Sequence, residues 1–152
     1  MHKTPPSQSS NRITFNLLGI SSVPLKERKR VKQLLMSMFE REGVLLNALT
    51  YVFVTDEYLL SLNKSFLKHD YYTDVITFDL SETKASRVGE IYISVPRVRE
   101  NAKSENVAVA SELLRVAIHG ALHLCGYKDK TKSEITKMRE KENEYLRLFE
   151  EH

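Results

Sequence analysis

One apolar stretch, VAVASELLRVAIHGALHLCGYKD at residues 107–129, organises this 152-residue chain. Residues 107–124 are strongly apolar and predict a helix that lies centrally and is buried in the fold. Gly126 follows directly, at a place where helices commonly end in a left-handed residue. The stretch therefore predicts a core helix with a turn immediately behind it.

The same stretch contains a candidate metal site. His119 and His123 are four residues apart, so a helix places both imidazoles on one face, one turn apart. After the break at Gly126 the chain can fold back and bring Asp129 towards them. Two neutral imidazoles and one carboxylate leave a fourth position open for water, as in catalytic zinc sites. A histidine pair alone more often belongs to the core, but the glycine break and the carboxylate favour a metal.

We expect one zinc ion per chain, held by these three side chains. The same ligand set can form the facial triad of non-haem iron, which is the alternative. The spacing resembles the metzincin pattern His-Glu-x-x-His-x-x-Gly-x-x-His, with two differences. Asp129 replaces the third histidine, whereas Gly120 replaces the glutamate that serves as general base. Glu112 and Asp74 are candidates for the base, and the sequence does not choose between them.

Two further polar residues lie on the histidine face of the predicted helix. Glu112 and Arg115 precede His119 at helical spacing. An ion pair between Glu112 and Arg115 is the simpler interpretation. Alternatively, Arg115 faces the site as a catalytic phosphate anchor, a role that suits its fixed fork of donors. Cys125 points about 200° around the helix from His123, at roughly 100° per residue, so we expect it to pack rather than bind metal.

Composition indicates one domain with an ordinary core, because 41% of the residues are hydrophobic. Residues 1–10 are polar and rich in Pro and Ser, so we expect a disordered tail there and a single domain over residues 11–152. No long apolar run is present, so no membrane helix is expected. The single Cys125 fits a cytoplasmic location. The net charge of +3 permits a polyanion partner, and the lysines within residues 128–132 would border the metal site.

Hydrophobic periodicity predicts a mixed, mainly parallel sheet of about four strands with helices packed on it. The strands are expected at residues 12–18, 49–53, 74–80 and 89–95. The short connector 81–88 predicts that the last two strands pair antiparallel. The fold class is therefore α/β (α+β), with the metal motif at the C-terminal end of a central helix.

The helices outside the metal motif are expected in four places. The first begins near Pro24 and closes at Gly43, and the second runs from a cap at Thr55 to residue 66 or 67. The third begins at Pro96 and breaks near residues 104–106. Ser133 is expected to cap the last helix, whose inward residues would be Ile135, Met138, Tyr145 and Phe149.

These motifs together resemble the YbeY family of bacterial single-strand-specific metallo-endoribonucleases. The family hallmark is His-Gly-x-Leu-His-Leu-x-Gly-Tyr-Asp-His, and the chain matches it at His119, Gly120, Leu122, His123, Leu124, Gly126 and Tyr127. Upstream, TDVITF at residues 73–78 and GEIYIS at residues 89–94 resemble two further family elements. Two positions differ. Asp129 replaces the third histidine of the family, and Leu67, which is followed by Lys68, replaces a basic residue.

The resemblance implies a cytoplasmic, zinc-dependent endoribonuclease that cuts single-stranded RNA. Its expected roles are maturation of the 3′ end of small-subunit rRNA and ribosome quality control, so its partners would be rRNA and the small ribosomal subunit, without DNA or a membrane. Substrate contacts are expected from Lys68, Thr73, Asp74 and Lys128. Two alternatives stay open: a zinc metallopeptidase-like hydrolase, which Gly120 argues against, and a non-catalytic ribosome-binding factor whose zinc only fastens the turn.

Overall fold

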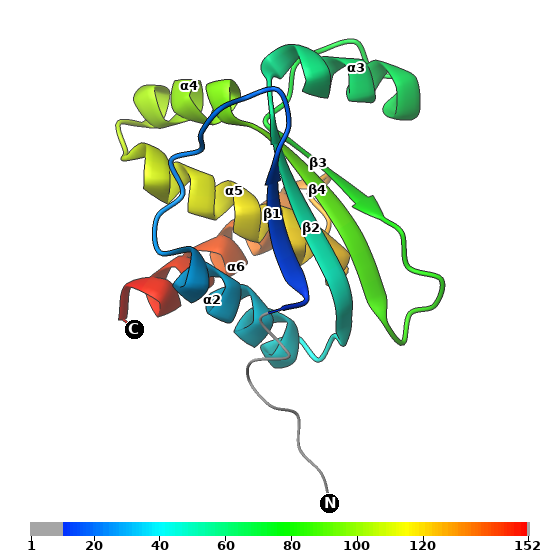
Figure 1. Ribbon diagram of the computed structural model, residues 1–152. Helices are drawn as coiled ribbons and strands as arrows, with labels where there is room; N and C mark the ends of the chain where they lie inside the picture. The colour runs from blue at the N-terminus through cyan, green and yellow to red at the C-terminus, as the bar shows by residue number, and fades with distance from the viewer. Residues whose placement is uncertain (1–10, 152) are drawn as a thin grey trace, which may run out of the picture.

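In the computed structural model, which describes residues 11–151, four strands form one sheet and five helices pack around it (Figure 1). The strands are β1 (Ile13–Leu17), β2 (Leu46–Val54), β3 (Val75–Asp79) and β4 (Arg87–Ser94). The helices are α2 (Arg28–Arg41), α3 (Asp56–Leu67), α4 (Val95–Glu105), α5 (Val109–Leu124) and α6 (Lys132–Glu151). The tail predicted at residues 1–10 lies outside the described residues.

The sheet is mixed, with the strand order β1-β2-β4-β3. β2 pairs parallel with both β1 and β4, while β3 runs antiparallel to β4 at the edge. Parallel neighbours need a long crossover, and the segment containing α2 supplies one between β1 and β2. The short connector between β3 and β4 suffices for an antiparallel pair. The predicted mixed, mainly parallel sheet is confirmed.

One face of the sheet forms the main core with α2, α4, α5 and α6 (Figure 1). Alternate strand residues point to this face and are buried, among them Ile13, Leu49, Tyr51, Phe53, Ile91 and Ile93. The buried Tyr51 hydroxyl donates a hydrogen bond of 2.7 Å to the carbonyl oxygen of Ala117 in α5. On the other face, Leu59 of α3 forms a second small cluster with Val54 and Ile76. The helix of the metal motif therefore lies in the main core, as predicted.

Two glycines let α5 lie close against β3 and β4. A side chain at Gly89 would collide with Leu124. A Cβ atom at Gly120 would lie 2.9 Å from Cγ2 of Ile91 and 3.1 Å from Oγ1 of Thr77. These separations are shorter than the roughly 3.5–4.0 Å of favourable carbon contacts. Position 120 therefore faces the sheet at a point where the helix and the strands leave no room for a side chain.

The helix ends follow the predicted signals, with two exceptions. The first helix does not begin near Pro24 but at Arg28, directly after Glu27, whose φ of 52° lies in the left-handed region. Thr55 caps α3 by accepting a 3.1 Å hydrogen bond from the amide three residues on. Gly126 follows α5 with a φ of 104°, the left-handed region that favours glycine. The predicted cap Ser133 is wrong. Thr131 accepts from the Glu134 amide at 3.1 Å, and the Glu134 carboxylate accepts from the Thr131 amide at 2.9 Å, which is a reciprocal capping box.

The inward residues of α6 were predicted correctly except in its first turn. Met138, Glu142 and Tyr145 are buried, and Phe149 packs against the main core. Ile135 lies on the same stripe but is 52% exposed, because the first turn borders the open cleft described below rather than the core.

No single helix among residues 11–151 is long and apolar enough to span a membrane. The helices α4 and α5 pass that test only as a pair, and the chain bends by 116° between them.

Candidate metal centre

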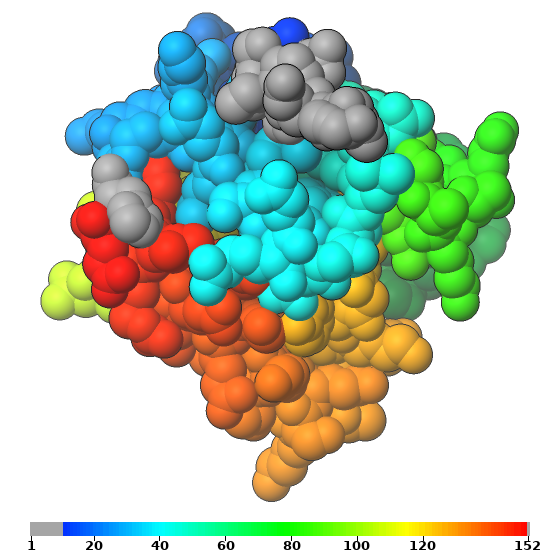
Figure 2. All heavy atoms as spheres, turned by 90° about the horizontal axis from the view of Figure 1, so that it is seen from below, coloured from blue at the N-terminus to red at the C-terminus, as the bar shows by residue number. Residues whose placement is uncertain are grey.

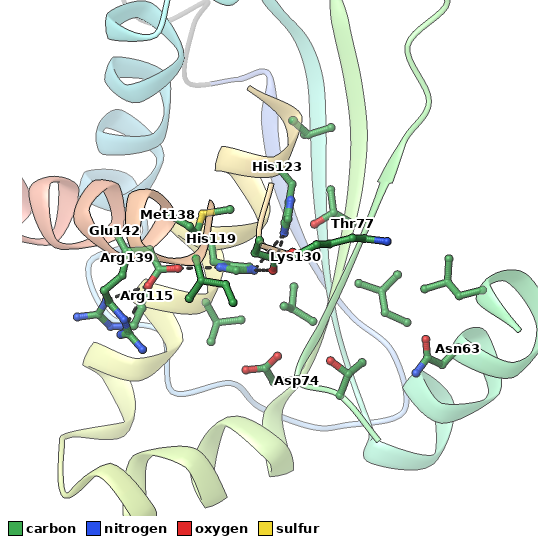
Figure 3. Close-up of a pocket in the computed structure, with 18 of the residues that line it drawn as sticks. Asn63, Asp74, Thr77, Arg115, His119, His123, Lys130, Met138, Arg139 and Glu142 are labelled. Carbon is green, nitrogen blue, oxygen red and sulfur yellow. Dashed lines mark hydrogen bonds and ion pairs between the residues drawn. The ribbon is translucent and has the colours of Figure 1, made fainter. Parts of the chain in front are cut away.

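The structure brings the three predicted metal ligands together at the end of α5. The Nε2 atoms of His119 and His123 lie 3.1 Å apart. The Oδ2 atom of Asp129 lies 3.2 Å from Nε2 of His119 and 3.3 Å from Nε2 of His123. Figure 3 shows the two imidazoles pointing toward one another above the cleft. The turn at Gly126 returns the chain so that Asp129 completes a triangle of potential ligand atoms.

The triangle has the dimensions that a small metal ion requires. Tetrahedral bonds of about 2.0–2.1 Å place neighbouring ligand atoms roughly 3.3–3.4 Å apart, close to the observed separations. Nδ1 of His123 lies 2.9 Å from the carbonyl oxygen of Tyr127, which can only accept a hydrogen bond. Nδ1 must therefore carry the proton, and the lone pair of Nε2 is left for a metal. Nδ1 of His119 faces Oε2 of Glu142 at 2.7 Å and is oriented in the same way.

Glu142 links the metal site to α6. Its carboxylate is buried and accepts hydrogen bonds from His119 at 2.7 Å and from Nη1 of Arg115 at 2.8 Å. Burial raises the pKa of Glu142, but the hydrogen bonds from His119 and Arg115 outweigh it and hold the pKa below its usual value. Arg115 also donates to Asn143 at 2.8 Å. The predicted ion pair of Arg115 with Glu112 is wrong, because α6 offers these acceptors instead.

The carboxylates around His119 also change its basicity. Burial lowers the pKa of the imidazole, but the hydrogen bond to Glu142 and the charges of Glu142, Asp129 and Asp74 raise it above the usual value. A proton on His119 competes with a metal for the same nitrogen. Metal binding at this site therefore weakens as the pH falls.

The two predicted candidates for the general base, Asp74 and Glu112, both line the cleft beside the triangle. Burial raises the pKa of Asp74, against the charge of His119 and a 2.9 Å hydrogen bond from Asn101. Burial also raises the pKa of Glu112, and the nearby charge of Asp74 adds to the effect. Carboxyl groups with raised pKa values suit proton transfer near neutral pH. Both carboxyl groups therefore have the position and the raised pKa that suit a general base.

The metal site opens into a cleft of about 760 Å³. Its walls come from α5 and the loop behind it, from β3, from α6, and from the end of α3 with the loop that follows. Predicted substrate contacts Thr73 and Asp74 line the cleft. Lys68 and Lys128 do not, and their role in substrate binding stays a prediction, whereas Leu67 does line it. Lys130, one of the lysines predicted to border the metal site, lines the cleft as well, and so does Arg139, which was not predicted (Figure 3).

A second carboxylate, Glu42 at the end of α2, fastens the loop that follows α5. It accepts hydrogen bonds from the Tyr127 hydroxyl at 2.7 Å, from Lys141 at 3.1 Å and from the Tyr145 hydroxyl. Burial raises the pKa of Glu42, but these three donors outweigh it and lower the pKa. Figure 2 shows the chain around residue 42 in cyan, against the orange atoms of α6. Since the Tyr127 carbonyl oxygen orients His123, this network supports the metal site from outside.

Two residues of the motif prove to be structural. Position 120 faces β3 and β4 without room for a side chain, so the glutamate of zinc peptidases has no place here. Cys125 is partly buried against the main core, as predicted, and burial raises the pKa of its thiol to about 12. A neutral thiol is a poor metal ligand. Among the residues that the structure describes, only His119, His123 and Asp129 form a cluster with metal-binding spacing.

The supporting carboxylate Glu142 was not predicted as part of the site, although the sequence contains a signal for it. Met138, Glu142 and Tyr145 follow one helical stripe, and a charged residue within a buried stripe requires a partner. The partner itself could not be read from the sequence, because His119 lies 23 residues away on another helix.

A central helix that presents two histidines to an open cleft, with a carboxylate added by the loop behind it, has the architecture of a metal-binding enzyme. The comparisons agree with this class. A family model described as Endoribonuclease YbeY matches residues 20–150. The chain belongs to the endoribonuclease YbeY family, which confirms the resemblance noted in the sequence.

Relatives match over most of their length. An endoribonuclease YbeY of Cytophaga hutchinsonii is 48% identical over 82% of this chain and 87% of its own. That of Porphyromonas gingivalis is 41% identical over 92% of this chain and 91% of its own. The solution structure of a Thermotoga maritima protein is 32% identical, covers 89% of this chain and 88% of its own, and gives a TM-score of 0.59.

Proposed function

We propose that the protein is a zinc-dependent endoribonuclease that cuts single-stranded RNA. Membership in the family makes it a nuclease, which is a hydrolase, and makes RNA its substrate. The ligand triangle of His119, His123 and Asp129, together with the family, indicates a metal. Zinc, at one ion per chain, is the metal that this donor set suits best.

We further propose that the protein acts in the cytoplasm on the 3′ end of small-subunit rRNA and in ribosome quality control. Maturation of rRNA agrees with the family to which the chain belongs. The ribosomal partner and the location are supported by the family resemblance and by the single cysteine.

The chemistry divides between the metal and the walls of the cleft. When bound, the metal would supply Lewis-acid stabilisation of charge on the phosphate. Arg139 has a side chain 61% exposed and only a loose 3.7 Å contact with Glu142, so it is free to bind a phosphate. Arg115 is engaged by Glu142 and Asn143 and mainly orients Glu142. Asp74 or Glu112 would accept a proton during hydrolysis.

The test combines elemental analysis with cleavage of labelled RNA. We expect one zinc ion per chain and cleavage of a single strand in preference to a duplex, and both should be lost in His123→Ala. Arg139→Ala should weaken cleavage while keeping the metal. A protein that binds zinc but cuts no RNA would support the non-catalytic factor. Chelator-sensitive digestion of casein would support the peptidase.

A further inference from the structure

The end of the cleft at α3 is formed by two exposed aromatic rings. His69 and Tyr71 both line the cleft that contains the metal ligands. Their ring centroids lie 5.0 Å apart with an interplanar angle of 22°, and the Tyr71 hydroxyl lies 2.7 Å from Nδ1 of His69. The side chain of Tyr71 is 56% exposed. The two rings thus form a stacked pair that is exposed to solvent at this end of the cleft.

This pair does not stabilise the core. Among the residues described, neither ring belongs to either of the two hydrophobic clusters. An aromatic side chain that stays exposed to water does not contribute the stabilisation that burial of its apolar surface would give. Leu67, which also lines this end, stands where the family resemblance leads one to expect a basic residue. This end of the cleft therefore offers stacking surface where charge was expected.

Asn63 holds the loop of the pair in place. Asn63 is only 2% exposed, at the last turns of α3. Its carbonyl oxygen accepts a 3.0 Å hydrogen bond from the His69 amide, and its side-chain Nδ2 donates to the Tyr71 carbonyl oxygen at 2.8 Å. An ion pair of 3.4 Å between Lys64 and Asp70 adds a further link. These contacts fix the backbone of the loop, and the bond between the Tyr71 hydroxyl and His69 holds the two rings together, which lowers the entropy lost on binding.

We propose that His69 and Tyr71 form a base-stacking subsite for the RNA substrate. The inference rests on the proposed function, and it names the part of the substrate that this end of the cleft binds. An unpaired base can stack on an aromatic side chain, whereas a base inside a duplex is already stacked and paired. A cleft of about 760 Å³ is within the range of small-molecule pockets, so one nucleotide fits. The subsite gives a physical reason for single-strand preference that charge alone does not give.

The chain offers a direct reporter, because it contains no tryptophan. In Tyr71→Trp, a short single-stranded RNA should quench the fluorescence by stacking on the indole, and a duplex should not. Tyr72→Trp is the matched control. The side chain of Tyr72 is 48% exposed, but its ring lies under the guanidinium group of Arg97, whose Cζ atom is 5.0 Å from the ring centroid. Tyr72 does not line the cleft. Equal quenching at positions 71 and 72 would overturn the subsite.

Affinity and salt dependence give a second readout. The double variant His69→Ala, Tyr71→Ala should bind single-stranded RNA at least about fivefold more weakly, since base stacking accounts for such factors. The slope of log affinity against log salt should not change, because it counts neutralised phosphates. Tyr71→Phe keeps the ring and should bind like the wild type. A reduced slope, or unchanged affinity in the double variant, would contradict the proposal.

These outcomes separate the subsite from the function on which it rests. If the wild type neither binds nor cuts single-stranded RNA, the proposed function fails. If the wild type binds and cuts RNA while the double variant, with normal circular dichroism and metal content, binds equally well, only the stacking subsite fails.

Discussion

Replacing Glu142 by glutamine should weaken metal binding far more than it weakens the fold. The carboxylate accepts one hydrogen bond from His119 and one from Arg115, using both oxygens. A glutamine has one acceptor oxygen and one NH₂ group. The charge-assisted bond to Arg115 is the stronger of the two, so the amide oxygen should face the arginine. The NH₂ group then faces Nδ1 of His119.

The consequence is a change of tautomer. Nδ1 of His119 can accept from the new NH₂ group only if its own proton moves to Nε2. Nε2 is the atom that lies 3.1 Å from Nε2 of His123 and 3.2 Å from Oδ2 of Asp129. Once Nε2 carries the proton, its lone pair is no longer available to bind the metal. Loss of such a supporting partner typically costs 10–100-fold in metal affinity. Since every hydrogen bond has a replacement, the free energy of unfolding without metal should fall by no more than about 1 kcal/mol.

Competition for zinc with a chromophoric chelator at neutral pH measures the affinity, and urea unfolding of the chelated protein measures the stability. Glu140→Gln, at an exposed position of the same helix, removes the same charge without touching His119 and is the matched control. The reasoning would be refuted if Glu142→Gln bound zinc within about twofold of the Glu140→Gln variant.

Four further predictions concern the ligand set, the fold without metal, the support of the loop and the packing of α5. Asp129→His should keep the metal and Asp129→Ala should lose it, as measured by elemental analysis, since either a carboxylate or an imidazole completes the triangle. Removing the metal with a chelator should leave the circular dichroism spectrum largely unchanged, because most of the core lies outside the motif. In the folded protein the pKa of Glu42 lies below its ordinary value of 4.5, so its stabilising effect is complete above about pH 4.5 and is lost as the pH falls further. The stability advantage of the wild type over Glu42→Gln in thermal melts should therefore shrink below that pH, and an advantage that grew would contradict the network. Gly120→Ala gains about 1 kcal/mol of helix propensity but overpacks against Ile91 and Thr77 at a cost of about 1–3 kcal/mol, so urea unfolding should show a net loss of up to about 2 kcal/mol.

Contacts that are close in sequence could be predicted, and distant ones could not. The alternation of Leu49, Tyr51 and Phe53 predicted a strand facing the core, because side chains on a strand alternate with a period of two. The triangle could be predicted because His119, His123 and Asp129 lie within one helix end and one turn. These features depend on local geometry alone.

The supports of the site depend on tertiary packing. Glu42 and Tyr127 are 85 residues apart and meet only because α2 packs against both α5 and α6, on either side of the loop that contains Tyr127. Arg115 had an acceptor on its own helix in Glu112 but pairs with α6, a choice that periodicity cannot make. The start of α6 shows the same limit on a smaller scale. Both Thr131 and Ser133 have the chemistry of a cap, and only the path of the loop selects Thr131.

The anchoring of Tyr127 by Glu42 has a consequence for how the molecule opens. The loop between α5 and α6 would ordinarily fray on its own, as exposed loops do. Here its tyrosine is tied to the end of α2 and, through the same carboxylate, to Lys141 and Tyr145 of α6. Amide hydrogens of the loop should therefore exchange at rates close to those of the adjoining turns of α2 and α6. These three segments then form one cooperative unit. A perturbation that opens α2 should therefore also release the metal.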